Sequence, residues 1–388
     1  MASTDDEPRR RWPRVTAWTA AALVVVLAAG MLGLSWYFSG IGIVPDHPAA
    51  GPADYVISTG ARTVTLTSSP NTLQPGEHGL AWEGGAAMVG GVVARGPGRV
   101  ERRLVRGTAP LPGTRVGLAW NYPGDPRPLL DTRISTVNVA TELGPAPAWY
   151  LPPPAHAPRA RRSTWVIGVH GQNGAPGSIL PAVLPMHRLG LPALVITYRN
   201  DIGAPASPDG LMHLGDTEWR DLDAAVRTAR RMGAKRVVLA GGSMGAATIF
   251  QWLRHSSQTG AAAGIVDDAG EIDWQTVIDY QAGQYHAPPG SGWLVARIIE
   301  MRTGMDVDGM RILRHPPAAR PPMLVFHGTA DKEVPVRESR DLAAAGPRLH
   351  WDITYDEFPG AGHTQSWNLD PARYDAAVTA FARGVLSR

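Results

Sequence analysis

Residues 239–250 read LAGGSMGAATIF, and this stretch decides the fold. A short apolar run ends in Gly241-Gly242-Ser243-Met244-Gly245, and a helical pattern follows directly. A serine between glycines at a sharp strand-to-helix turn exposes its hydroxyl, because larger neighbours would collide with backbone. Ser243 is therefore a candidate nucleophile. The other interpretation, a phosphate-binding loop, lacks the G-K-[ST] ending that such a loop needs.

Four further runs share the character of the strand before Ser243: TWVIGVHG at 164–171, ALVITYRN at 193–200, AAGIVDD at 262–268 and PMLVFHG at 322–328. Short, continuous apolar runs are typical of strands buried on both faces of a parallel sheet. Amphipathic helical patterns separate them. The alternation predicts a mostly parallel, doubly wound α/β sheet over residues 135–388.

A serine nucleophile requires a base and an acid that orients the base. Asp331 in HGTADKEVP and His363 in GAGH come after Ser243, each close to the end of a predicted strand. We expect His363 to accept the Ser243 proton and Asp331 to fix the imidazole. Asp267 and Asp268 follow another strand and stay open as alternative acids.

The negative charge of a tetrahedral intermediate needs hydrogen-bond donors close to the nucleophile. The backbone N–H of Met244 is one candidate, at the first turn of the predicted helix. The loop His170-Gly171-Gln172-Asn173-Gly174 supplies the second, with the Gln172 N–H preferred. His170 itself is interpreted as a structural residue beneath this loop.

Together these motifs resemble the α/β-hydrolase superfamily, particularly serine aminopeptidase and BEM46-like hydrolases. The resemblance covers residues 136–388 and implies the α/β-hydrolase fold with a triad of Ser243, Asp331 and His363. The chain also looks like uncharacterised membrane-anchored actinobacterial α/β-hydrolases. It departs from BEM46-like sequences at Asn200-Asp201-Ile202, where those tend to have Gly-Tyr-Gly. The motifs that carry the resemblance are VHGQNG, YRN, GGSMGA, HGTADKEVP and GAGH.

The first 54 residues predict a membrane anchor. Residues 16–38 form an apolar run long enough to cross a hydrocarbon core of ~30 Å as a helix. Arg9, Arg10, Arg11 and Arg14 precede it, so residues 1–15 are expected in the cytoplasm and everything after residue 40 outside the cell membrane. Residues 39–54 are interpreted as a linker. A signal peptide, cleaved to give a secreted protein, is the alternative.

Two segments of the exported part are less informative. Residues 55–134 predict a small β-rich accessory region without a readable role. Residues 269–320 predict a small cap whose aromatic side chains either line an acyl pocket or belong to the core: Trp274, Tyr280, Tyr285 and Trp293. Trimming the first 40 residues is expected to leave a soluble, active protein.

Composition excludes several classes of site. The chain has no cysteine, which removes disulfides, thiolate metal sites and a cysteine nucleophile. Formal net charge is +3 without a basic stripe, so no nucleic-acid partner is expected. The acidic loop 199–219 matches no standard ligand spacing, and we expect no metal and no cofactor.

These observations predict a membrane-anchored serine hydrolase, carboxylesterase-like, that cleaves a small-molecule or lipid-like ester through an acyl-enzyme. A serine peptidase is the alternative within the same chemistry. A non-catalytic binding module with this fold is the alternative of another class.

Overall fold

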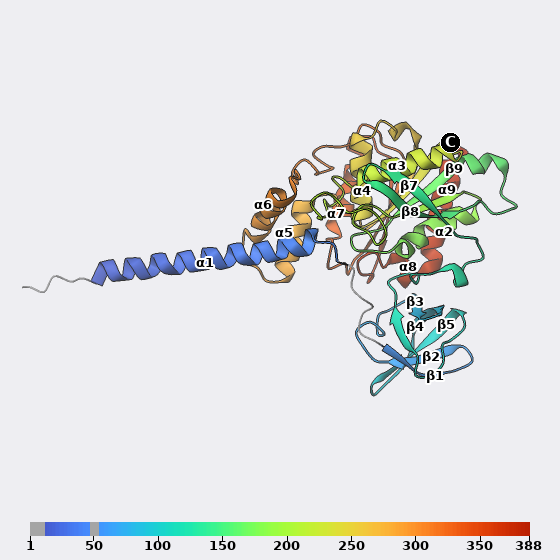
Figure 1. Cartoon of the computed structure of the whole chain (residues 1–388), viewed down its shortest axis with the longest axis horizontal. Helices are drawn as coiled ribbons and strands as arrows, with labels where there is room; N and C mark the ends of the chain where they lie inside the picture. Colours follow the sequence, from blue (N-terminus) through green and yellow to red (C-terminus); the bar gives the residue numbers. More distant parts are fainter. Residues whose placement is uncertain (1–11, 47–53) are drawn as a thin grey trace, which may run out of the picture.

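The computed structural model describes residues 12–46 and 54–388. Figure 1 shows a long helix that projects from an α/β domain, with a small β-barrel on another side of that domain. The helix, α1 (Trp12–Ile43), meets the domain beside α5 (Trp274–Gln284) and α6 (Ser291–Thr303).

An eight-stranded sheet forms the centre of the α/β domain, in the order β14-β13-β12-β11-β9-β10-β8-β7. The pairs from β10 to β14 are parallel, and β7 and β8 add an antiparallel edge. The predicted buried strands are confirmed, and the fold is that of an α/β-hydrolase. The strands are β7 (Ser135–Thr141), β8 (Gly144–Leu151), β9 (Thr164–Val169), β10 (Ala193–Ile196), β11 (Arg236–Gly242), β12 (Ala262–Asp268), β13 (Met323–Gly328) and β14 (Ile353–Phe358).

Helices cover both faces of this sheet, and each face has its own apolar core. On one face α2 (Leu180–Arg188) and α9 (Pro371–Ser387) pack over residues such as Val238 and Phe326. On the other, α3 (Trp219–Arg231), α4 (Met244–His255) and α7 (Arg337–Leu349) pack over Ile167 and Leu239. Two buried faces explain why the strands read as continuous apolar runs.

The predicted β-rich region is a closed six-stranded barrel followed by a connecting segment. Its strands are β1 (Asp54–Thr59), β2 (Thr63–Thr67), β3 (His78–Trp82), β4 (Gly85–Gly96), β5 (Arg99–Gly107) and β6 (Arg115–Leu118). Arg102 is fully buried beside the barrel core, and its guanidinium donates to the carbonyls of Thr72, Gln74 and Gly76. Those bonds fix the loop between β2 and β3, which meets the α/β domain.

The helix α1 is longer than the sequence predicted. It continues through residues 39–43, which were assigned to the linker, and Ile43 is fully buried. The Ile43 carbonyl accepts a hydrogen bond from the Met212 N–H at 2.7 Å. Packing against the domain therefore prolongs the helix, a contact that local composition does not reveal.

Among the described residues, one helix segment is long and apolar enough to span a membrane, Trp18–Ile43, with a mean hydropathy of 2.0. Only 6% of its most apolar window is buried inside the protein. A core helix would be covered by other elements, whereas this one needs an apolar environment from outside. A signal sequence has the same composition and position.

Candidate active site

Ser243 occupies a strained turn between β11 and α4. Its backbone has φ 52° and ψ −131°, a region that costs a non-glycine residue about 1–3 kcal/mol. A Cβ on Gly241 would lie 2.6 Å from the Ala246 nitrogen, and one on Gly245 would lie 2.2 Å from the Val169 carbonyl oxygen. Neither glycine can be replaced without moving backbone, so the G-x-S-x-G pattern has the steric origin expected from the sequence.

Asp331 and His363 lie together as the sequence predicted. His363 Nδ1 and Asp331 Oδ2 are 2.8 Å apart, and both side chains are buried. The backbone N–H groups of Glu333 and Val334 donate to the other oxygen of Asp331. Because the carboxylate is held from two directions, the imidazole is fixed through Nδ1, and its Nε2 lies 3.7 Å from Glu333 Oε2 at the cavity.

The electrostatics of this pair favour a charged imidazole. Burial alone would lower the pKa of His363, but the hydrogen bond and charge of Asp331, with Glu333 and Glu271, raise it to about 9. Burial would raise the pKa of Asp331, yet hydrogen bonds to His327 and His363 hold it well below its usual range. His327, unassigned from the sequence, thus helps to keep Asp331 ionised.

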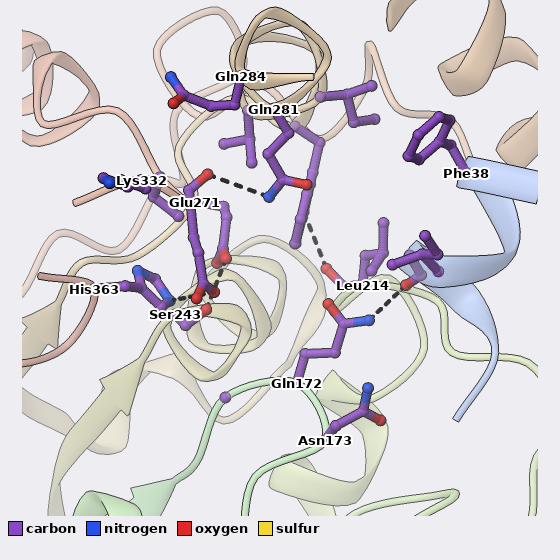
Figure 2. Close-up of a pocket in the computed structure, with 18 of the residues that line it drawn as sticks. Phe38, Gln172, Asn173, Leu214, Ser243, Glu271, Gln281, Gln284, Lys332 and His363 are labelled. Atoms are coloured by element: carbon purple, nitrogen blue, oxygen red, sulfur yellow. Dashed lines mark hydrogen bonds and ion pairs between the residues drawn. The ribbon is translucent and has the colours of Figure 1, made fainter. Parts of the chain in front are cut away.

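The Ser243 hydroxyl has a partner that the sequence did not predict. Its Oγ donates to Glu271 Oε1 at 2.9 Å, instead of to His363 as expected. Glu271 is buried, and its other oxygen has no hydrogen-bond partner within the described part of the chain. Burial raises the pKa of Glu271 to about 8, against the opposing effects of His363 and Ser243. Figure 2 shows Ser243, Glu271 and His363 gathered on one side of the cavity.

Glu271 reaches Ser243 because the chain turns sharply after β12. Ala269 has φ 56°, and a Cβ on Gly270 would lie 2.5 Å from the Ala246 side chain. The acidic cluster DDAGE directly after a predicted strand was the available signal. Of its other carboxylates, neither Asp267 nor Asp268 forms the hydrogen bond to His363 Nδ1 that Asp331 forms.

The loop that carries Gln172 lies against the nucleophile. A Cβ on Gly171 would be 3.5 Å from Ser243 Oγ, which places the neighbouring backbone beside the reacting atom. Met244 begins α4 immediately after Ser243. The two N–H groups expected to stabilise an oxyanion therefore belong to segments that flank the serine.

His170, at the start of that loop, is buried with its Nε2 3.0 Å from Asp201 Oδ2. Its ring stacks on Tyr198, with centroids 4.6 Å apart. These contacts match the structural role expected from the sequence. Asp201 stands in the segment that departs from the BEM46-like pattern, so that segment here supports the loop from below.

The barrel domain contacts the segment that follows His363. Trp120 Nε1 donates to Thr364 Oγ1 at 2.8 Å, and Asn368 Nδ2 donates to the Glu77 and Trp120 carbonyls. Thr364 has φ 48°, a conformation that a β-branched residue adopts only where its surroundings hold it. The accessory region thus fixes the loop of the candidate base, a role that its sequence did not disclose.

Ser243, Glu271 and His363 line a cavity of about 1730 Å³. This volume exceeds the ~300–1,000 Å³ that is typical of ligand sites. Of the four cap aromatics, Trp274 and Tyr285 line it. Tyr280 instead donates its hydroxyl to the Asp331 carbonyl, and Trp293 is 59% exposed at the surface. The acyl-pocket interpretation therefore fits part of this set.

No group of three or more metal-ligating side chains is arranged to hold a metal ion in the described ranges 12–46 and 54–388. In the acidic loop, Asp209 lies 3.1 Å from His213, and Glu218 accepts from the backbone of His213 and Gly215. Those carboxylates order the loop.

Comparisons with known proteins agree with this geometry. The prolyl oligopeptidase family model matches residues 208–387, and a domain of unknown function (DUF8805) matches residues 55–119, the barrel. No curated protein matches the chain.

Solved structures share the fold at low identity. An esterase of Pyrococcus furiosus is 18% identical with a TM-score of 0.52, over 68% of this chain and 94% of that one. The protein EstE5 is 18% identical with a TM-score of 0.50, over 66% of this chain and 86% of that one. The acylaminoacyl peptidase of Pyrococcus horikoshii is 13% identical with a TM-score of 0.51, over 85% and 62%. On its sheet order, its nucleophile turn and these matches, the chain has the α/β-hydrolase fold.

Proposed function

We propose that this protein is a membrane-anchored serine hydrolase that cleaves carboxylic esters with Ser243, His363 and Asp331. The observation that carries the proposal is that His363, hydrogen-bonded to Asp331, lines the same cavity as a serine on a strained turn. The proposed nucleophile, base and orienting acid lie on three different loops at the ends of sheet strands, and together they supply the three roles that this chemistry requires.

In the proposed reaction, the Ser243 hydroxyl leaves Glu271 and turns toward His363 Nε2, which accepts its proton. The oxygen then bonds to the ester carbonyl carbon, and the N–H groups of Gln172 and Met244 stabilise the oxyanion. His363 protonates the departing alcohol as the carbon–oxygen bond breaks. A water molecule, deprotonated by His363, then bonds to the acyl carbon. His363 returns the proton to Ser243 Oγ as the bond from Oγ to that carbon breaks, which releases the acid. No step requires a cofactor.

An ester is preferred to a peptide because of the rest of the cavity. The charged groups that line it, among them Glu271, Lys332 and Glu333, belong to the catalytic end, and the remaining lining is largely apolar. A peptide would bring backbone donors and acceptors into a region with few partners for them. The neighbours include both an esterase and an acylaminoacyl peptidase, so a serine peptidase is the second candidate.

The proposed location follows from α1. The arginines at positions 9, 10, 11 and 14 precede the span, and the next Lys or Arg after it is Arg62. This asymmetry favours a single-pass protein of the cell membrane with its N-terminus in the cytoplasm and the hydrolase domain outside.

The test is a panel of nitrophenyl esters and aminoacyl nitroanilides, given to the full chain in detergent with Ser243→Ala and His363→Ala alongside. We expect ester turnover that both variants lose. Preference for the anilides would support the peptidase. Turnover that survives Ser243→Ala would exclude the proposed mechanism, and an inert folded wild type would favour a binding module.

A further inference from the structure

One face of α1 forms a wall of the cavity that contains Ser243. Most lining residues of the helix recur at intervals of three and four, so they share one side, and Val26 and Gly30 border that side. Several are strongly exposed despite lining the cavity, including Leu27 at 63% and Leu34 at 49%. The cavity is therefore an open groove along this part of the helix. We call the apolar members of this side the stripe, and Ser35 lies on the same side as its one polar lining residue. The stripe consists of Val24, Leu27, Ala28, Met31, Leu34, Phe38, Ile41 and Gly42.

Hydrogen bonds join the end of α1 to the loop beside Ser243. Gln172 Nε2 donates to the Gly42 carbonyl at 2.7 Å, which joins the last turn of α1 to the loop beside Ser243. Asn173 Oδ1 accepts from the Asp46 N–H at 2.9 Å. Figure 2 shows Phe38 and Gln172 across the cavity from His363. Val24 and Gly42 are 18 residues apart. At ~1.5 Å per residue the stripe runs about 27 Å away from the catalytic end.

The cap helices meet α1 where it enters the domain. The rings of Phe38 and Tyr285 are 5.2 Å apart, and the Arg302 guanidinium lies 4.7 Å from the centre of the Trp36 ring. Arg302 also donates to Ser39 Oγ at 2.8 Å. Trp293 of α6 is 59% exposed, and Tyr37 of α1 is 64% exposed. Exposed aromatic rings of this kind are typical of a membrane–water interface, which places the mouth of the groove at the bilayer surface.

Charge separates the two ends of the groove. The catalytic end contains Asp268, Glu271, Glu333, Lys332 and His363, whereas the lining residues of α1 carry no charge. A hydrocarbon chain fits beside the uncharged lining of α1. It carries no polar groups, so none is left without a hydrogen-bond partner next to the lipid.

We propose that α1 is one wall of the substrate site, and that the substrate is a long-chain carboxylic ester taken directly from the outer leaflet of the same membrane. Its carbonyl lies at Ser243, and its acyl chain lies along the stripe toward Val24. The inference rests on the proposed function, since it names the substrate class of that same site.

The test uses a pair of matched variants of the full chain in phosphatidylcholine vesicles. Leu34 lines the groove, whereas Leu32 points elsewhere on the same helix and is 53% exposed. Leu34→Trp narrows the groove, and Leu32→Trp makes the same change outside it. The probes are 4-methylumbelliferyl palmitate and 4-methylumbelliferyl acetate. Leu34 is eight residues from Gly42, about 12 Å along the helix, so an acetyl group does not reach it.

We expect wild type to prefer palmitate. Leu34→Trp should lower kcat/KM for palmitate about tenfold, close to 1.4 kcal/mol, and leave acetate within about twofold. Leu32→Trp should change neither. Equal effects of the two tryptophans, or no preference for palmitate in a protein that hydrolyses acetate, would overturn the inference while the proposed function stands. If acetate turnover does not exceed that of Ser243→Ala, the proposed function itself fails.

Discussion

The two ends of the cavity are built in different ways. At the catalytic end, Ser243, Asp331 and His363 are buried or nearly so and come from loops at the ends of sheet strands. At the other end, a single apolar helix outside the α/β domain supplies an open wall. The loops of the sheet thus carry the catalytic residues, while α1 selects which ester substrates reach them. Changes at the first end should affect every substrate, and changes at the second should depend on chain length.

The largest effect is expected from removing the nucleophile. Ser243→Ala should lower kcat by about 10⁴-fold or more for short and long esters alike, because the remaining groups cannot replace the covalent step. Measurement of kcat on both ester lengths checks it. A variant that loses activity on one length only would contradict the separation of the two ends.

Removal of the helix should give the next largest effect. A chain that begins at residue 41 keeps Gly42 and Ile43, with their bonds to Gln172 and Met212, but loses Phe38 and the part of the apolar stripe that precedes it. We expect palmitate hydrolysis to fall about 10- to 100-fold, or ~1.4–2.7 kcal/mol, with acetate hydrolysis retained. The sequence alone predicted a soluble, active trimmed protein. Comparison of the palmitate and acetate rates with those of the full chain checks the expected change in selectivity.

The difference between the catalytic end and the α1 end of the cavity also explains which features could be predicted from the sequence. The sheet, the nucleophile turn and the order of Asp331 and His363 follow from local patterns, since buried strands and glycine-flanked turns impose their own residue types. Glu271 was missed because its place depends on a turn at Ala269 and Gly270 that folds it back onto α4. The role of α1 was missed for a similar reason. Apolar residues in a span look the same from the sequence whether they face lipid or line a substrate groove.

A smaller change, seen in the pH profile, is expected from Glu271→Gln. The base must be neutral to accept a proton, and the pKa of His363 is raised to about 9, so activity should rise with pH toward that value. The negative charge of Glu271 is one of the causes that raise the pKa of His363. The glutamine variant should therefore reach half-maximal kcat/KM at a lower pH than wild type.

Glu338→Gln is the matched control for that profile. Glu338 is also buried with its pKa raised to about 7, but it accepts from the backbone of Ile272 and Asp273 instead of contacting Ser243. The Glu338→Gln variant should therefore reach half-maximal kcat/KM at the same pH as wild type. A midpoint that stays unchanged in Glu271→Gln as well would show that Glu271 does not influence His363.

The smallest effect concerns the barrel domain, which reaches the catalytic end through Trp120. Trp120→Phe removes the hydrogen bond to Thr364 and should cost about 1 kcal/mol in unfolding free energy, with a kcat loss of about threefold. Thr364→Ala removes the same bond from the other side. The effects of the two changes on kcat should not add in the double variant, because each deletes one shared interaction. Additive losses, measured on acetate and palmitate, would mean that the barrel acts on His363 by another route. An effect on palmitate alone would mean that Trp120 acts as part of the cavity lining and not through the loop of His363.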